Sequence, residues 1–158
     1  MSDNVICDGY GGGDEHLHRI SAKDIMARFA ITVNEDSYLL SVAHLMMRFR
    51  ISGLPVLSRS GEIVGIITAT DLFRSIGEYI SKGNASDFFV KTSKEKVKDV
   101  MTREVHHVTP DTSFMELIKI MHNKNIHTLP VIDKGEIVGI IGRRDVINTF
   151  FNPSSGTA

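Results

Sequence analysis

The chain has a single cysteine, Cys7, and no tryptophan. One cysteine excludes an internal disulfide and a cysteine-rich metal site, and this is typical of a reducing compartment. Long apolar runs are also missing, since no stretch approaches the roughly 18 consecutive apolar residues of a membrane span. The first residues lack the basic flank and apolar run of a signal peptide. We therefore expect a cytoplasmic protein with no membrane insertion and no bound metal.

The chain also lacks an excess of either charge. Its 158 residues contain 18 Lys and Arg against 19 Asp and Glu, a formal net charge of −1. Because proteins that hold a phosphate backbone use a surplus of basic residues, this balance argues against nucleic acid as a partner. A hydrophobic content of 42% is ordinary for a globular chain of about one domain.

The chain contains an internal repeat. Lys23–Met26, Leu54–Val56 and Gly61–Ile67 recur in the same order as Lys98–Met101, Leu129–Val131 and Gly135–Ile141. The offset is 75 residues before Ser60 and 74 after it, because Ser60 has no counterpart in the second copy. A deletion at a turn is what a duplicated fold tolerates, so we infer two copies of one structural unit.

Apolar periodicity predicts the same element order, β-α-β-β-α, in each copy. The first strands are expected at 30–33 and 105–108. The helices that follow are expected to start at Asp36-Ser37 and Asp111-Thr112, which are N-cap candidates, and Ser113 and Glu116 also fit a capping box. A hairpin and a last helix, opening at Asp71 or Asp145, complete each copy. The predicted fold class is α/β of the α+β type, with the two repeats paired about a pseudo-two-fold axis. The expected divisions are a flexible tail at 1–17, repeats at 18–80 and 96–151, a linker at 81–95 and a C-terminal tail at 152–158.

The end of the hairpin in copy one carries candidate binding chemistry. There a strand runs from Gly65 directly into a helix that opens near Thr68, Thr70 and Asp71. Unpaired amides at a helix N-terminus favour a phosphate, a threonine hydroxyl donates to one, and a carboxylate suits the cis-diol of a ribose. From the residues alone, a helix cap formed by Asp71 or Thr70 explains the pattern better.

These motifs, taken together and twice over, resemble the CBS domain, named after cystathionine β-synthase, and the tandem resembles a Bateman module. The resemblance covers about residues 18–151. It implies binding of adenosine compounds in clefts between paired repeats, with Thr68 on phosphate and Asp71 on ribose. It also implies an adenine pocket in copy one and its counterpart in copy two, for which core packing is the alternative: Ile31, Thr32, Val33, Gly53, Leu54, Pro55, Val56, Ile67, His107, Leu129, Pro130 and Val131.

Copy two departs from the pattern at the phosphate position. Gly142 replaces the threonine, Asp145 is retained, and Arg143 and Arg144 stand between them. Arginine can bind phosphate bidentately, and the resemblance, through the sensor subunit of the AMP-activated kinase, places Arg144 and His127 against phosphates. The alternatives are a solvated arginine pair and a packed histidine, in which case copy two has lost its site.

The remaining motifs are weaker indications of function. The glycines at 9–13 do not follow a strand, so a phosphate loop there is not expected. His16 and His18 are expected to be solvated, and His106 and His107 to be structural residues of a strand, although His107 facing a cleft stays open.

The sequence offers no nucleophile elbow, metal cluster or carboxylate pair that would indicate catalysis. We therefore predict a regulatory module, not an enzyme, that senses AMP, ADP or ATP, forms a homodimer and passes its binding state to an effector protein. The alternatives are a sensor of S-adenosylmethionine and a ligand-free scaffold for dimerisation.

Overall fold

The computed structural model describes residues 13–83 and 87–152, and these form two compact units. One unit, here called the central unit, is Phe29–His107 and is continuous in the chain. The other, called the composite unit, joins the residues up to Arg28 with those from Val108 onward. The units therefore differ from the sequence repeats, because Lys23–Met26 of copy one lies with copy two. Most of the predicted tails, 1–12 and 153–158, lie outside the described residues.

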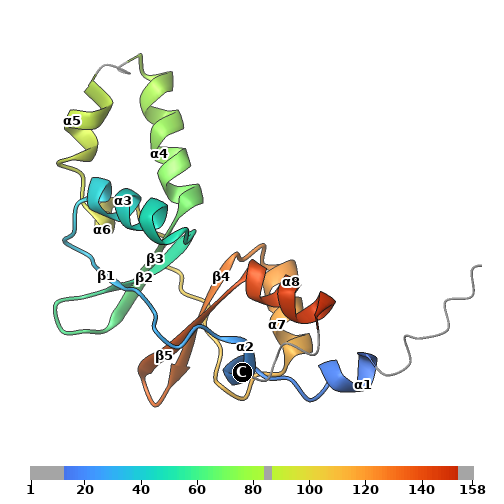
Figure 1. Ribbon diagram of the computed structural model, residues 1–158. Coiled ribbons are helices and arrows are strands. Elements are labelled where there is room, and N and C mark those ends of the chain that lie inside the picture. Colours follow the sequence, from blue (N-terminus) through green and yellow to red (C-terminus); the bar gives the residue numbers. More distant parts are fainter. Residues whose placement is uncertain (1–12, 84–86, 153–158) are drawn as a thin grey trace, which may run out of the picture. The chain divides into compact units, whose positions relative to one another are not determined.

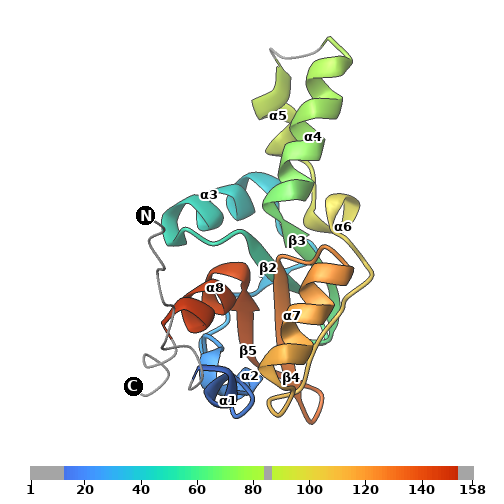
Figure 2. The ribbon, with the colours of Figure 1, turned by 90° about the vertical axis from the view of Figure 1, so that its right-hand side faces the viewer.

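The central unit contains one three-stranded sheet with helices around it (Figure 1). Strand β2 is in the middle, parallel to β1 and antiparallel to β3. The elements are β1 (Val33–Asn34), α3 (Leu39–Phe49), β2 (Gly53–Leu57), β3 (Ile63–Thr68), α4 (Ala69–Ser81), α5 (Phe88–Thr92) and α6 (Val97–Val100). The order β-α-β-β-α predicted for copy one is confirmed, and the predicted linker adds α5 beside α4 (Figures 1 and 2).

The core of the central unit follows the helical spacing seen in the sequence. Leu39, Val42 and Met46 occupy one face of α3 and are buried against the sheet residues Leu54 and Ile67. Val97 and Met101, from the stretch that opens copy two, belong to the same core. Copy one is therefore completed by residues of copy two.

The composite unit contains the hairpin of copy two and the helices that flank it. Its elements are α1 (Gly13–Leu17), α2 (Ala22–Ile25), α7 (Phe114–Asn123), β4 (Thr128–Asp133), β5 (Glu136–Gly142) and α8 (Arg143–Phe151). Phe114 and Leu117 of α7 are fully buried against the hairpin. Leu17, Ile20 and Ala22 from the start of the chain pack into this core.

The first strand of each copy is shorter than predicted. In copy one the strand begins at Val33 instead of residue 30. In copy two the prediction of a strand at 105–108 is wrong, because only Val108 pairs, through a single bridge to Val131. The amide of Val108 donates to Pro130 and its carbonyl accepts from Ile132. Immediately after, the Thr109 amide donates to the hydroxyl of Thr112, which turns the chain away from the sheet. His106 and His107 are consequently not strand residues.

The predicted helix caps are correct at one of the three positions. Ser113 caps α7, since its hydroxyl accepts from the Glu116 amide at 3.3 Å. The prediction of Asp36-Ser37 as the cap of α3 is wrong, because Tyr38 holds that position and makes no side-chain cap. Asp36 and Asp111 bind lysines instead.

The two copies exchange the segments that precede their first strands. Segment 22–27 lies on the hairpin of copy two through an antiparallel bridge between Ala27 and Ile140, and segment 97–102 lies on copy one through a bridge between Thr102 and Ile66. Each of these segments comes so close to the hairpin that a glycine is needed at the contact. A Cβ added at Gly65 would lie 2.6 Å from Sδ of Met101, and one added at Gly139 would overlap Met26. We call 22–27 and 97–102 the exchanged segments.

Among the described residues, no helix has the length and apolar character needed to cross a bilayer.

Candidate functional site

In the central unit, the strand-to-helix turn predicted as a binding site begins at Thr68. The Thr68 hydroxyl accepts from the Asp71 amide, and the Asp71 carboxylate accepts from the Thr68 amide at 2.8 Å, so the pair forms a capping box at the start of α4. Gly53 stands opposite Thr68 in the sheet, and Val56 stands opposite Val33. Gly53 therefore lies beside the start of α4, whereas the pair of Val33 and Val56 lies three residues further along β2.

The Asp71 carboxylate is buried and fully occupied. The residue is 2% exposed. Its Oδ2 accepts from the amide and the hydroxyl of Thr68, both at 2.8 Å. Its Oδ1 accepts from Nη2 of Arg74 at 2.7 Å and from the hydroxyl of Thr102 at 3.1 Å. Because a carboxylate has about four acceptor positions, these bonds leave none for a ligand hydroxyl in this conformation.

The sequence analysis missed two of the groups that bind Asp71. Arg74 follows Asp71 by three residues, a spacing that places both on one side of a helix, so this contact was available from the pattern. Thr102 lies in an exchanged segment, and its contact with Asp71 depends on where that segment packs. The Thr68 hydroxyl donates to Asp71, so its only proton is not directed at a phosphate.

The other residues predicted for copy one divide by burial. Thr70 is exposed, and Ile31 and Thr32 are half-buried. The remaining predicted pocket residues of the strands lie in the core of the central unit: Val33, Gly53, Leu54, Pro55, Val56 and Ile67. His107 is exposed at the end of the unit.

In the composite unit, the corresponding carboxylate is largely open. Asp145 is half-buried, and its Oδ2 accepts from the Gly142 amide at 2.7 Å. Within the described part of the chain no other donor reaches this carboxylate. The repeat explains the difference, because Gly142, Ala27 and Asn148 occupy the positions of Thr68, Thr102 and Arg74. Gly142 and Ala27 have no side-chain donor, and the side-chain amide of Asn148 makes no hydrogen bond to Asp145, whereas all three counterparts donate to Asp71.

Basic side chains surround the start of α8. Arg144 is exposed, and Arg143, also exposed, donates from Nη2 to the Asn125 side chain at 2.8 Å. The Arg143 amide donates to the carbonyl of His127 at 3.1 Å, which places the backbone of His127 next to the helix start. Burial, and secondarily the charge of Arg143, lowers the pKa of His127 below its usual value of 6.5. His127 is therefore neutral at pH 7. The other residues predicted for this copy, Leu129, Pro130 and Val131, are buried in β4.

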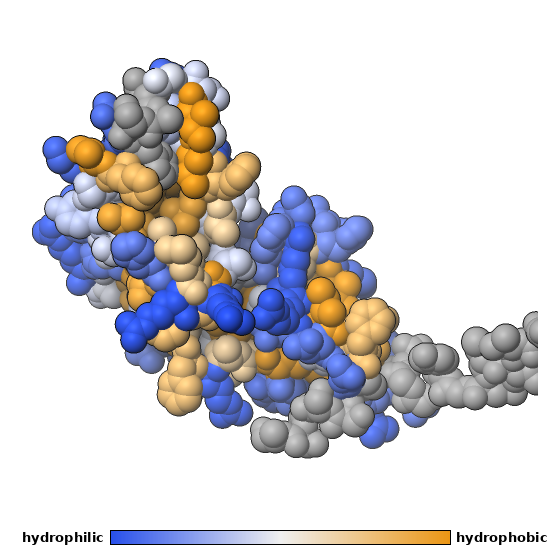
Figure 3. Space-filling model, turned by 45° about the horizontal axis from the view of Figure 1, so that its top comes forward, coloured by the Kyte–Doolittle hydropathy of each residue, from blue (hydrophilic) through white to orange (hydrophobic). Residues whose placement is uncertain are grey.

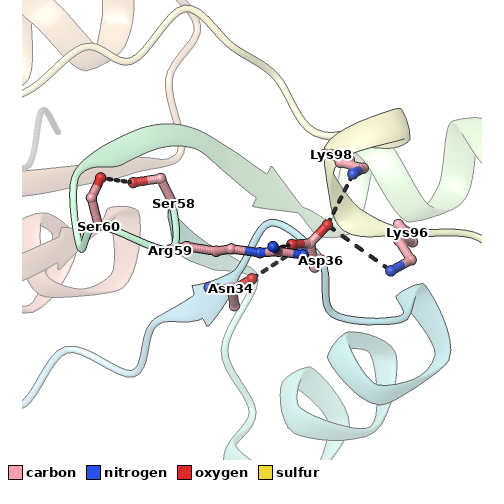
Figure 4. A network of polar contacts seen from close by, with 7 residues as sticks. All are labelled: Asn34, Asp36, Ser58, Arg59, Ser60, Lys96 and Lys98. Atoms are coloured by element: carbon pink, nitrogen blue, oxygen red, sulfur yellow. Dashed lines mark hydrogen bonds and ion pairs between the residues drawn. The ribbon is translucent and has the colours of Figure 1, made fainter.

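A separate charged cluster holds the exchanged segment of the central unit in place (Figure 4). The Asp36 carboxylate accepts from Nζ of Lys98 and from Nε of Arg59, both at 2.9 Å. Lys96 lies at 4.0 Å from the same carboxylate. These bonds lower the pKa of Asp36 to about 2. The cluster joins the β1–α3 loop, the hairpin turn and α6, and it is structural.

No group of three or more histidines, cysteines or acids gathers as a metal site among the residues placed by the structure. His16 and His18 lie in or next to α1, away from the two strand-to-helix turns in sequence.

Comparison with known families matches a model of the CBS domain to residues 22–78 and again to residues 97–152. The chain belongs to the CBS-domain family. The mixed fold of two repeats predicted from the sequence is thereby confirmed as a CBS pair.

Curated relatives of this CBS pair include a protein of similar length and several much longer enzymes. The uncharacterized protein MJ1426 of Methanocaldococcus jannaschii is 35% identical over an alignment covering 79% of this chain and 88% of the relative. An inosine-5'-monophosphate dehydrogenase of the same organism is 28% identical, over 85% of this chain but 25% of the enzyme. A homoserine O-acetyltransferase of Methanosphaera stadtmanae is 30% identical, again over 85% of this chain and 25% of the enzyme. The CBS pair thus spans about a quarter of these enzymes.

Solved structures with the same fold include other CBS pairs. The CBS domain of a CBS domain containing membrane protein from Sphaerobacter thermophilus has a TM-score of 0.71 and 30% identity, covering 86% of this chain and 91% of that one. The CBS domain pair of protein MJ0100, in complex with 5'-methylthioadenosine and S-adenosyl-L-methionine, has a TM-score of 0.68 and 25% identity, covering 83% and 99%. Protein MJ1225 of Methanocaldococcus jannaschii, described as a putative archaeal homolog of g-AMPK, has a TM-score of 0.73 and 28% identity, covering 87% and 50%.

Proposed function

We propose that this CBS pair is a regulatory module that binds an adenosine ligand and passes its binding state to a partner protein. The observation that carries the proposal is the strand-to-helix turn at the start of α8, where Asp145, three residues after the N-cap, accepts a single hydrogen bond from the chain. The turn at the start of α4 repeats its backbone arrangement. A carboxylate at such a turn accepts from the two hydroxyls of a ribose, and the helix start favours a nearby phosphate.

The choice among adenosine ligands depends on the groups near the carboxylates. Arg143 and Arg144 add two positive charges at the start of α8, which favours a phosphorylated ligand such as AMP, ADP or ATP. The MJ0100 structure, with its 5'-methylthioadenosine and S-adenosyl-L-methionine, supports ligands without a phosphate. The proposal commits to AMP, ADP or ATP, with S-adenosylmethionine as the alternative.

Thermal unfolding of the full chain with each ligand tests this proposal. AMP, ADP, ATP and S-adenosylmethionine are added separately, and the double variant Asp71→Asn with Asp145→Asn serves as the control. A ligand at about 100 times its Kd adds roughly 2.7 kcal/mol to the stability of the folded state, which raises the Tm by several degrees in a chain of this size. No shift with any of the four ligands contradicts the proposal.

A second candidate is a ligand-free scaffold whose repeats serve only to dimerise and dock a partner. The occupied carboxylate of Asp71 and the absence of a hydroxyl at Gly142 favour it. Adenine absorbance in protein purified without added ligand separates the two candidates, because retained nucleotide excludes a ligand-free scaffold.

The proposal includes a homodimer formed through apolar helix surfaces. Apolar side chains gather over the region of α3, α4 and α5 (Figure 3), where Leu40, Met47, Ile76 and Phe89 line a groove of about 190 Å³. The last helix of each copy exposes apolar residues at matched positions, Phe73 and Ile76 on α4 and Ile147 and Phe150 on α8. Exposed apolar patches of this kind suit a second copy of the chain, since two-fold dimers bury the same patch on both subunits.

A further inference from the structure

The two carboxylates of the proposed ligand site differ in how many donors of the chain they already accept. Asp71 accepts four hydrogen bonds, three of them from side chains, whereas Asp145 accepts one, from a backbone amide. Asp71 is also 2% exposed, while Asp145 is half-buried and reachable. A ribose diol therefore finds free acceptor positions at Asp145 and none at Asp71.

Two of the donors to Asp71 come from side chains that the second copy does not have. Arg74 and Thr102 together occupy Oδ1, the oxygen that the capping box leaves free. Their counterparts in the repeat are Asn148 and Ala27. Asn148 follows Asp145 by the same three residues, and Ala27 makes the same bridge to β5 that Thr102 makes to β3. The backbone is thus equivalent in the two copies, and the side chains make the difference.

We infer that Arg74 and Thr102 are positioning residues that close Asp71 to ligand, so that the CBS pair binds one adenosine ligand per chain, through Asp145. This inference rests on the proposed function and names which of its two carboxylates works. Asp71 becomes a structural residue that ties α4 to the exchanged segment 97–102. Opening it requires a ligand to displace an arginine and a threonine from a buried carboxylate, which costs more than binding an open one.

Calorimetric titration of the full chain with AMP, and in parallel with S-adenosylmethionine, tests the inference. Wild type is expected to bind one ligand per chain. Asp145→Asn is expected to weaken binding by about tenfold or more, the usual effect of losing a hydrogen bond to a charged group. Asp71→Asn is expected to keep the affinity within about threefold of wild type, and to lower the Tm by about 5 °C because the capping box and the tie to Thr102 weaken.

Exchanging the closing residues between the copies gives the matched control. Arg74→Asn with Thr102→Ala opens Asp71 and is expected to raise the stoichiometry from one to two. Ala27→Thr with Asn148→Arg closes Asp145 and is expected to abolish binding. Arg74, Ala27 and Asn148 are exposed, so these changes leave the cores intact.

The outcomes separate this inference from the function on which it rests. Binding lost in Asp71→Asn but retained in Asp145→Asn, or two equivalent sites in wild type, overturns the inference and leaves the proposed function standing. No binding of either ligand to wild type or to the opened variant overturns the proposed function itself.

Discussion

The ammonium group of Lys23 lies 2.7 Å from Oδ1 of Asp111, 88 residues further along the chain. The same pair recurs in the other unit, where Nζ of Lys98 lies 2.9 Å from Oδ1 of Asp36. In both cases a lysine of an exchanged segment contacts the aspartate before the first helix of the other copy. Because this ion pair occurs in both units, the exchange of segments 22–27 and 97–102 is a feature that the two copies of the repeat share.

The Asp36 cluster predicts a pH dependence of stability in the acid range. Lys98 and Arg59 lower the folded-state pKa of Asp36 from 3.8 to about 2. The unfolded chain therefore takes up a proton first, so the stabilising effect of Asp36 is present above about pH 4 and is lost as the pH falls towards 2.

Urea unfolding between pH 7 and pH 3 measures this effect. The difference in stability between wild type and Asp36→Asn is expected to be largest above pH 5 and to shrink below pH 4. A difference that stays constant down to pH 3 contradicts the assignment.

Removal of residues 1–28 is expected to destabilise the composite unit selectively. The deletion removes Leu17, Ile20 and Ala22 from a core that also contains Phe114, and it removes the bridge from Ala27 to Ile140. Hydrogen exchange followed by mass spectrometry is expected to show faster exchange in α7, β4 and β5 but little change in β2 and β3. Equally accelerated hydrogen exchange in both hairpins contradicts this prediction.

Alanine at Gly65 or Gly139 is expected to lower stability by about 1–3 kcal/mol, the usual cost of overpacking. The two positions differ in what the new methyl group meets. At Gly65 the three nearest atoms include the carbonyl oxygen of Thr102 at 2.9 Å besides atoms of Met101, whereas at Gly139 all three nearest atoms belong to Met26. In denaturant unfolding, Met26→Ala is therefore expected to recover more of the loss at Gly139 than Met101→Ala recovers at Gly65, where the contact with the Thr102 carbonyl remains. Equal recovery at both positions contradicts this.

His127 predicts a pH dependence of ligand affinity, if the proposed function holds. Its pKa is lowered by burial and by Arg143, so the ring is neutral at pH 7. A phosphate nearby favours the charged ring, so binding of AMP takes up a proton and strengthens as the pH falls from 7.5 to 6. Titrations of wild type and His127→Gln with the same ligand cancel the ligand's own ionisation. Parallel pH profiles for the two proteins exclude contact between His127 and the phosphate.

Most of the element order was predictable because it depends on local spacing. The apolar positions of α3 and α7 and the hairpins follow from residues within a few positions of one another. The last helices were also predicted, although they begin at Ala69 and Arg143 instead of at Asp71 and Asp145. The failures lie at Val105–Val108 and at the caps Asp36 and Asp111. There the chain's pairing partners are set by distant segments, such as the lysines of the exchanged segments, which periodicity does not reveal.

The sequence pointed to the aspartates of the two strand-to-helix turns as candidates, but it did not show how the chain itself occupies their carboxylates. The repeat aligned Asp71 with Asp145 and identified Gly142 as a departure. It did not reveal that Arg74 and Thr102 occupy Asp71, because Thr102 reaches that carboxylate from 31 residues away. The ligand and residue roles implied by the family resemblance remain predictions.

The discontinuity of the composite unit has a consequence for synthesis on the ribosome. The central unit is complete once His107 has been made, whereas residues up to Arg28 wait for Val108 and the residues beyond it. At typical elongation rates the delay is on the order of ten seconds. During that time Leu17 and Ile20 have no core to enter, so a segment that is made before the central unit is buried only after that unit is complete.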